Sequence, residues 1–157
     1  MVRIGITGHA NLTDATAGLV AGELRRLLAG HAGLVGVTCL ARGADQVFAR
    51  TVLELGGTLE VVLPAADYRD REVEPDNAAE FDGLLAEAAV HTMPFAESGG
   101  AAYLAAGEHL LSIVDKLVAV WDGGPSGGLG GTADVVEAAR KRGMDVTVVW
   151  PERAARG

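Results

Sequence analysis

The segment from Asp122 to Thr132 has the composition of a phosphate-binding loop. Pro125 fixes one turn, and six glycines fall within nine residues: Gly123, Gly124, Gly127, Gly128, Gly130 and Gly131. Glycine lets a backbone adopt positive φ angles and approach a ligand closely. The sequence after Thr132 predicts a helix, whose first N–H groups and dipole favour an anion. The alternative is a plain flexible connection, although such connections rarely exceed about six residues. The residues expected to contact ligand here are Asp122, Gly128, Gly130, Gly131 and Thr132.

Two further turns carry chemically useful residues directly after strand-like runs. Gly8 and His9 follow the run 2–7, and His9 either contacts a ligand or caps the next helix. The turn Arg42-Gly43-Ala44-Asp45 follows the run 34–40. Its arginine supplies a fixed positive charge, and Asp45 either pairs with a helix dipole, worth at most about 1 kcal/mol, or faces a ligand. We include both turns in the expected binding site.

The remaining titratable residues give weaker signals. Eight carboxylates lie between Asp67 and Glu87, and most are expected to form a solvated face. Tyr68 and Arg69, just after a third strand-like run, are expected at the pocket rim. No carboxylates have metal-ligand spacing, so the sequence indicates no metal site and no cofactor. The single cysteine, Cys39, cannot form an internal disulfide. We expect its side chain to be buried and to pack as a small apolar group rather than to act as a nucleophile.

Strand-like and helix-like runs alternate along the whole chain, which we interpret as a single domain spanning 1–157. The expected strands are 2–7, 34–40, 58–63, 90–95, 116–121 and 145–150. The expected helices begin after Thr13, near Ala44, near Ala78 (to about Ala89), after an N-cap at Ser98, and at Thr132. This order predicts a three-layer α/β Rossmann-like fold with a doubly wound, mainly parallel sheet. The tail 152–157 is expected to fray.

In such sheets the ligand lies at the carboxyl ends of strands, where the strand order reverses. The three turns should therefore meet in one crevice. The dinucleotide fingerprint GxGxxG is absent after the first strand, which argues against an ordinary NAD-dependent dehydrogenase.

The composition and net charge of the chain restrict the classes of partner that it is expected to bind. Apolar residues make up 49 % of the chain, but no run is long enough to span a bilayer, and no basic region precedes the first strand. We therefore expect no membrane partner and a cytoplasmic location. The formal net charge is −8. Affinity for DNA or RNA depends on neutralising phosphates, so a nucleic-acid partner is unlikely, whereas a single nucleotide needs only loop amides and one or two basic side chains.

Three segments together resemble the SLOG superfamily of Rossmann-like nucleotide-binding proteins, which unites the DprA and Lonely Guy (LOG) proteins. They are IGITGH at Ile4–His9, LARGAD at Leu40–Asp45 and GGLGGTADVV at Gly127–Val136. The resemblance implies nucleotide binding on these loops and a homodimer, for which the segments 101–113 and 78–89 offer apolar faces. The LOG branch releases the base from nucleoside 5′-monophosphates.

The chain departs from the LOG pattern at two places. The signature PGGxGTxxE, aligned on Gly131 and Thr132, puts its glutamate on Val135, while Asp134 lies one position earlier. The Arg-Lys pair of the preceding LOG helix is also absent. We therefore expect a cytoplasmic sensor or binding module for a nucleotide-derived ligand. The alternative is a phosphoribohydrolase with Asp134 as the catalytic carboxylate, and DNA handling of the DprA type is a third, weaker reading.

Overall fold

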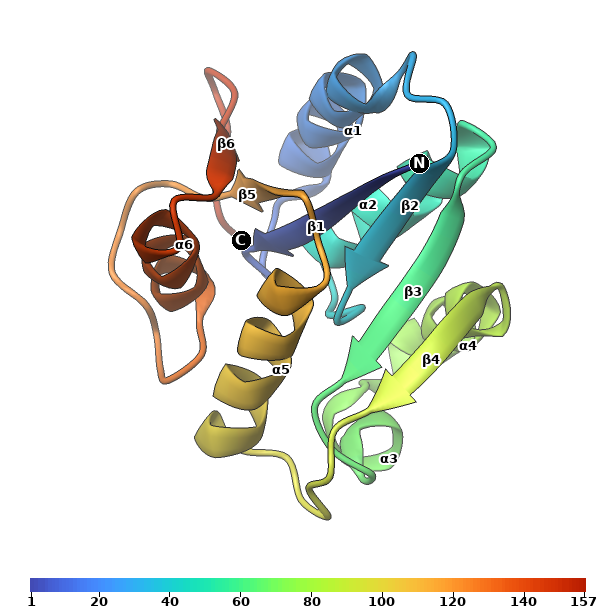
Figure 1. The fold of residues 1–157 in the computed structure, drawn as a ribbon, viewed down its shortest axis with the longest axis vertical. Helices are drawn as coiled ribbons and strands as arrows, with labels where there is room; N and C mark the ends of the chain where they lie inside the picture. Colours follow the sequence, from blue (N-terminus) through green and yellow to red (C-terminus); the bar gives the residue numbers. More distant parts are fainter.

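Six parallel strands form one sheet in the computed structural model, which describes residues 1–157 (Figure 1). The strands are β1 (Val2–Gly8), β2 (Leu34–Thr38), β3 (Thr58–Leu63), β4 (Ala88–Thr92), β5 (Lys116–Val120) and β6 (Asp145–Val149). The helices are α1 (Asp14–Leu28), α2 (Ala44–Glu54), α3 (Tyr68–Glu72), α4 (Ala78–Ala86), α5 (Gly100–Ser112) and α6 (Thr132–Lys141), with a short 3₁₀ turn at Pro75–Asn77. The fold is thus an α/β Rossmann-like fold, as the alternation predicts.

The strand order β4-β3-β2-β1-β5-β6 places the reversal of strand order between β1 and β5. The chain first builds outward from β1 to β4, and α5 then carries it back to β5 on the other side of β1. At this junction Gly8 pairs with Val120, so both strands end together. A reversal of this kind opens a crevice at the carboxyl ends of the two strands.

A separate hydrophobic core covers each face of the sheet. The larger core joins α1, α2 and α4 to the sheet through residues such as Leu24, Phe48 and Phe81. The smaller core joins α5 and α6 to the opposite face, with Leu110 and Ala139 at its centre. Figure 1 shows α5 and α6 in front of the sheet and α2 and α4 behind it. Strands covered on both faces explain the continuous apolar runs of the sequence.

Local chemistry explains why several elements begin where they do. The Thr13 Oγ1 accepts a hydrogen bond from the Thr16 backbone N–H at 3.2 Å, so Thr13 caps α1 as expected. Gly36 in β2 lets α2 approach closely, because a Cβ there would lie 2.9 Å from the Phe48 ring and 2.7 Å from a Val52 methyl group. The packing of α2 on the sheet therefore requires glycine at this position.

Four details differ from the sequence-based expectations. Strand β4 lies two to three residues earlier than 90–95, at an edge where most of its residues are exposed, so its pattern carries little apolar signal. Helix α4 ends at Ala86, before β4 begins. The short helix α3 occupies part of the acidic segment, where only a solvated face was expected. Gly99 is the N-cap of α5, because the Ser98 hydroxyl instead donates to Asp67 at 2.8 Å.

The tail 152–157 is docked rather than frayed. Leu12 and Arg156 form an antiparallel bridge, and the Ala155 N–H donates to the Thr16 hydroxyl at 2.7 Å. The Asn11 side-chain amide donates to the Gly157 carbonyl at 3.1 Å. Sequence patterns missed this contact because it joins residues at opposite ends of the chain. None of the helices combines the length and apolarity that crossing a bilayer requires.

Candidate functional site

A cavity of about 420 Å³ lies at the carboxyl ends of the central strands. Nine of its 19 lining residues are hydrophobic, contributed mainly by β1, α5 and α6. Its polar side chains are Thr7, Arg42, Asp45, Glu72 and Thr132, and two of the nine hydrophobic residues are the tyrosines Tyr68 and Tyr103, whose hydroxyls are polar. This volume is within the range of about 300–1,000 Å³ that small-molecule sites occupy. We call this space the tyrosine cavity.

A second cavity of about 320 Å³ adjoins the first along the glycine-rich loop. Only four of its 15 lining residues are hydrophobic. It is bordered by the loop from Pro125 to Gly131, by the first residues of α6, by His9 and Asn11, and by Arg156. We call it the glycine-loop cavity. The two cavities share Gly8, Ala10, Tyr103, Gly130, Gly131 and Thr132, so they are adjacent, the tyrosine cavity being the more apolar and the glycine-loop cavity the more polar.

Hydrogen bonds within the glycine-rich loop hold it in one conformation. The Gly130 N–H donates to Asp134 Oδ2 at 2.9 Å, and the Asp134 N–H donates to the Ser126 Oγ at 3.1 Å. Gly130 has a φ of 80°, and a Cβ there would lie 2.7 Å from the Leu104 backbone nitrogen. The loop therefore needs glycine at this position to pack against α5.

The N-terminus of α6 presents free donors to the glycine-loop cavity. Gly131 is the N-cap residue and offers no side-chain cap. The backbone N–H groups of Thr132 and Ala133 have no hydrogen-bond acceptor in the chain. Both residues line the cavity. Free N–H groups at the positive end of a helix dipole favour an anion such as phosphate.

His9 is fixed beside this polar end as a neutral imidazole. Its Nε2 accepts the Asp122 backbone N–H at 3.1 Å, and its ring packs edge-on against Trp150 with centroids 5.5 Å apart. Burial is the main cause that lowers the pKa of His9, and the positive charge of Arg156 lowers it further. Asp122 Oδ1 lies 3.2 Å from Nε2, a contact that becomes an ion pair only when the ring is protonated. Thr13, rather than His9, caps α1.

Asp45 lies almost fully buried in the wall of the tyrosine cavity, with 6 % of its surface exposed. Its Oδ2 accepts the Ala41 N–H at 3.3 Å. Burial raises the pKa of Asp45 to about 7, although hydrogen bonds to the carboxylate oppose the shift. Near neutral pH a large fraction of Asp45 is thus protonated, and the group can donate a hydrogen bond into the cavity. A simple partnership with the α2 dipole would instead favour the ionised form.

The aromatic end of the cavity contains Tyr68 and Tyr103, whose rings meet edge-on with centroids 6.4 Å apart. Burial is the main cause that raises the pKa of both phenols, so both hydroxyls are protonated. Arg42 reaches the same cavity but is paired with Asp76, at 2.8 and 3.2 Å. Arg69 pairs with Asp82 and does not line either cavity, although it was expected at the rim.

The cavities bring together most, but not all, of the residues expected from the sequence. Gly8, Arg42, Asp45, Gly130, Gly131 and Thr132 line the tyrosine cavity, and His9 and Gly128 line the glycine-loop cavity. Gly43, Ala44, Asp122 and Asp134 line neither. Gly43 has a φ of 86° and a Cβ there would lie 2.6 Å from the His9 carbonyl oxygen, so its role is close backbone packing.

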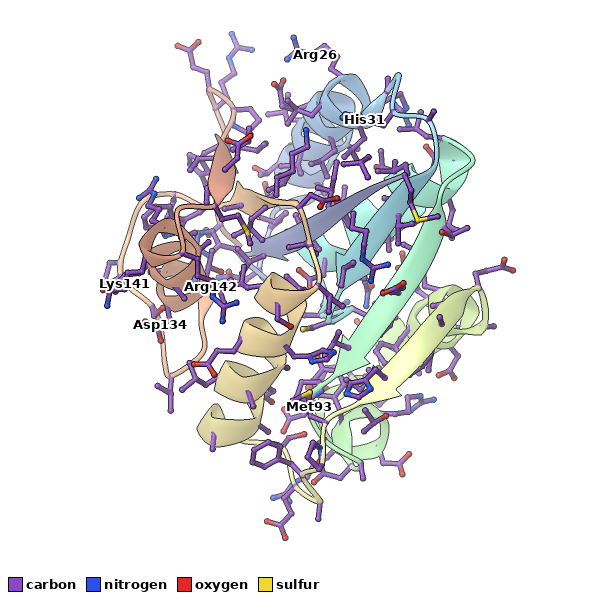
Figure 2. All side chains as sticks on the ribbon, in the orientation of Figure 1. Arg26, His31, Met93, Asp134, Lys141 and Arg142 are labelled. Carbon is purple, nitrogen blue, oxygen red and sulfur yellow. The ribbon has the colours of Figure 1, made fainter.

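Asp122 and Asp134 both use their carboxylates to fix the loop. Asp122 Oδ1 accepts the Gly124 N–H at 2.8 Å, which is the main cause of the lowered pKa of Asp122. The Asp134 side chain lies at the start of α6, beside the loop whose Gly130 N–H it accepts (Figure 2).

The lining residues that sequence reasoning missed include Ser126, Glu72, Tyr103 and Arg156. Ser126 sits among the glycines and offered a detectable signal, since a hydroxyl there can cap the following helix. The other three come from α3, α5 and the tail, and only the tertiary fold brings them to the cavity. No group of three or more histidine, cysteine, aspartate or glutamate side chains is placed to hold a metal ion.

Comparison with solved structures supports the fold. No protein-family model and no curated protein sequence matches the chain. Among solved structures, DNA processing protein A (DprA) from Streptococcus pneumoniae aligns with a TM-score of 0.72 and 17% identity, over 96% of this chain and 51% of that chain. DprA from Helicobacter pylori aligns with a TM-score of 0.66 and 17% identity, over 96% of this chain and 66% of that chain. The chain thus spans about half to two thirds of these proteins.

Two other structures share the fold over most of their length. TM1055 aligns with a TM-score of 0.61 and 21% identity, over 93% of this chain and 72% of that chain. The Moco carrier protein of Chlamydomonas aligns with a TM-score of 0.56 and 21% identity, over 94% of this chain and 74% of that chain. At these identities the likeness shows the fold alone, and DprA, to which the sequence motifs drew attention, is among the proteins that share it.

The comparisons weaken one expectation. The Helicobacter pylori DprA structure describes a mode of binding single-stranded DNA, so a fold of this type is compatible with a nucleic-acid ligand. The case against nucleic acid in this chain rests on its net charge of −8 and not on its fold.

Proposed function

We propose that this chain binds a nucleotide or nucleotide-derived small molecule across the two adjacent cavities at the carboxyl ends of β1 and β5, as a sensor or binding module. The phosphate end of the ligand occupies the glycine-loop cavity, and the base and sugar occupy the tyrosine cavity. The observation that carries this proposal is that an apolar cavity and a polar cavity lie side by side and share the lining residues Gly8, Gly130 and Thr132.

The chemistry of the two ends matches the two ends of a nucleotide. The polar end offers the free N–H groups of Thr132 and Ala133, which suit a phosphate. The apolar end offers two tyrosine rings and a protonated carboxyl at Asp45, which suit a planar base with hydrogen-bonding edges. Neither end alone would distinguish a nucleotide from a simpler anion or a simple apolar ligand.

Calorimetric titration with the common nucleoside 5′-monophosphates tests the proposal. Gly128 lines the glycine-loop cavity, and a Cβ there would meet no atom within 4 Å, so a larger side chain fits the fold but alters the cavity wall. We expect Gly128→Val to abolish binding without unfolding the protein. Gly99→Val is the matched control, since a Cβ at Gly99 also meets nothing within 4 Å and Gly99 lines neither cavity. Equal affinity in wild type and Gly128→Val would place the ligand elsewhere.

Gly131→Val, the simplest substitution suggested by the glycine pattern, is a poorer test. A Cβ at Gly131 would lie 2.9 Å from the Ser126 Oγ, which accepts the Asp134 N–H. The variant would therefore disturb the loop as well as the ligand space.

Titration of a single-stranded oligonucleotide in parallel separates a small-molecule function from a DNA-binding one. We expect weak, strongly salt-dependent oligonucleotide binding at most, because the molecule is acidic. Tight oligonucleotide binding without nucleotide binding would replace the proposed function.

Hydrolysis of the nucleotide is the second candidate function, with Asp134 as the residue in question. We expect base release to be absent or slow, because the Asp134 carboxylate holds the Gly130 N–H and does not line the cavities. Glu72 is a carboxylate that does line the tyrosine cavity. Base release that disappears in Asp134→Asn or Glu72→Gln, with nucleotide binding retained, would make the chain an enzyme.

A further inference from the structure

The docked tail brings a positive charge to the polar end of the site. We propose that Arg156 is the cation that pairs with the ligand's phosphate, an inference that rests on the nucleotide-binding function proposed above. Arg156 lines the glycine-loop cavity together with Thr132 and Ala133. It comes from the segment after β6, which neither the glycine-rich loop nor the strand ends would have identified.

Contacts with the β1–α1 connection hold the tail in place. The Arg156 Nε donates to Asn11 Oδ1 at 3.1 Å, and the Thr13 N–H donates to the Ala155 carbonyl at 3.4 Å. The Ala155 N–H donates to the Thr16 hydroxyl at 2.7 Å. With the bond from the Asn11 side-chain amide to the Gly157 carbonyl, these bonds fix the backbone on both sides of Arg156, so part of the entropy cost of placing a long side chain at the cavity is met before a ligand arrives.

The terminal nitrogens of Arg156 remain available to a ligand. They make no hydrogen bond in the structure, and Nη1 forms only a long ion pair with Asp122 Oδ2 at 3.6 Å. Asp122 directs its other oxygen to the Gly124 N–H. A guanidinium offers planar paired donors that match phosphate oxygens.

No other basic side chain can serve the glycine-loop cavity in the same way. His9 is the other basic group in its wall, and burial keeps the ring neutral with Nε2 already an acceptor. Arg42 lines only the tyrosine cavity and is held by both oxygens of Asp76. An anion in the glycine-loop cavity would thus meet the N–H groups of α6 on one side and Arg156 on the other.

The position of Arg156 in the glycine-loop cavity predicts the class of ligand that the site prefers. Arg156 should favour a ligand with a phosphate monoester at its end over the corresponding neutral nucleoside. Its side chain is 43% exposed, so solvent screens part of the interaction. We therefore expect Arg156 to contribute roughly tenfold in affinity, near the lower end for a hydrogen bond to a charged group.

Calorimetry with adenosine and adenosine 5′-monophosphate, and with the other nucleosides and their monophosphates, tests the inference on three variants. Arg156→Gln removes the charge, and Arg156→Lys keeps it. Arg153→Gln removes a charge from the same tail at a residue that lines neither cavity. We expect Arg156→Gln to weaken monophosphate binding roughly tenfold and to leave nucleoside binding unchanged. Arg156→Lys should retain most of the affinity for monophosphates. Arg153→Gln should bind both ligands as wild type does.

Two results would overturn the role of Arg156 while leaving the proposed function intact. Unchanged monophosphate affinity in Arg156→Gln would exclude a contact with phosphate. Equal weakening of nucleoside and monophosphate would show that Arg156 acts only by docking the tail. If wild-type protein binds none of the nucleosides, the monophosphates or inorganic phosphate, both the inference and the proposed function fail.

Discussion

Replacing Asp45 by asparagine should change how the stability of the protein depends on pH. Burial raises the pKa of Asp45 to about 7 in the folded protein, from an ordinary value of 3.8. The folded state therefore keeps a proton that the unfolded chain releases between about pH 4 and pH 7. The folded pKa is the higher one, so stability falls as pH rises through this window and the loss is complete above it.

The size of this effect follows from the shift. About three pKa units at 1.36 kcal/mol each correspond to up to about 4 kcal/mol of unfolding free energy. Asparagine cannot ionise, yet its side-chain oxygen can still accept the Ala41 N–H that Asp45 binds. Asp45→Asn should therefore gain stability relative to wild type by up to about 4 kcal/mol between about pH 4 and pH 8.

Urea unfolding followed by circular dichroism, without ligand and at several pH values, measures this difference. Asp70→Asn is a control that removes the same formal charge from an exposed residue outside both cavities. A constant difference between Asp45→Asn and wild type across the whole range would refute the reasoning, because it would mean that Asp45 has the same pKa in the folded and unfolded states.

Three further predictions concern the loop, the core and the assembly. Asp134→Asn should weaken the hydrogen bond to the Gly130 N–H and so make the glycine-rich loop more mobile. Faster amide hydrogen exchange in the loop would reveal this change. Base release from monophosphates should stay negligible in this variant. Gly36→Ala should destabilise the protein by about 1–3 kcal/mol in urea unfolding, because its Cβ meets Phe48 and Val52, whereas Gly22→Ala in α1, with nothing within 4 Å, should stabilise it by up to about 1 kcal/mol. Sedimentation at micromolar concentration should give a homodimer, and a clean monomer would remove that prediction.

The fold was predictable because its signals are local. Runs such as Leu117–Val120 are apolar throughout, which marks strands covered on both faces, and Thr13 is a standard helix cap. The edge strand β4 was placed less well, since exposed residues such as Val90 and His91 follow no clear period. The helix start at Gly100 was also misassigned, because Ser98 uses its hydroxyl in a tertiary contact.

The candidate site was predictable only in part. Glycines and strand-end turns identified Gly8, Asp45 and the glycine-rich loop, because these features follow directly from the chain order. Tyr103 and Arg156 were not predicted from the sequence, because α5 and the tail reach the cavity through contacts between residues that lie far apart in the sequence. The sequence also could not separate residues that face the ligand space from those, such as Asp134, that hold the loop in shape.

Amide chemical shifts provide the most direct test of nucleotide binding at this site. Two-dimensional N–H correlation NMR spectra recorded during titration with each nucleoside 5′-monophosphate report on every backbone N–H group separately. We predict that the largest shifts fall on the loop from Gly127 to Gly131 and on the first two residues of α6, with smaller shifts around Tyr68 and Tyr103. The two residues of α6 are Thr132 and Ala133, and their N–H groups have no acceptor in the chain. Saturable shifts confined to another surface, or no shift with any monophosphate, would contradict nucleotide binding at the carboxyl ends of β1 and β5.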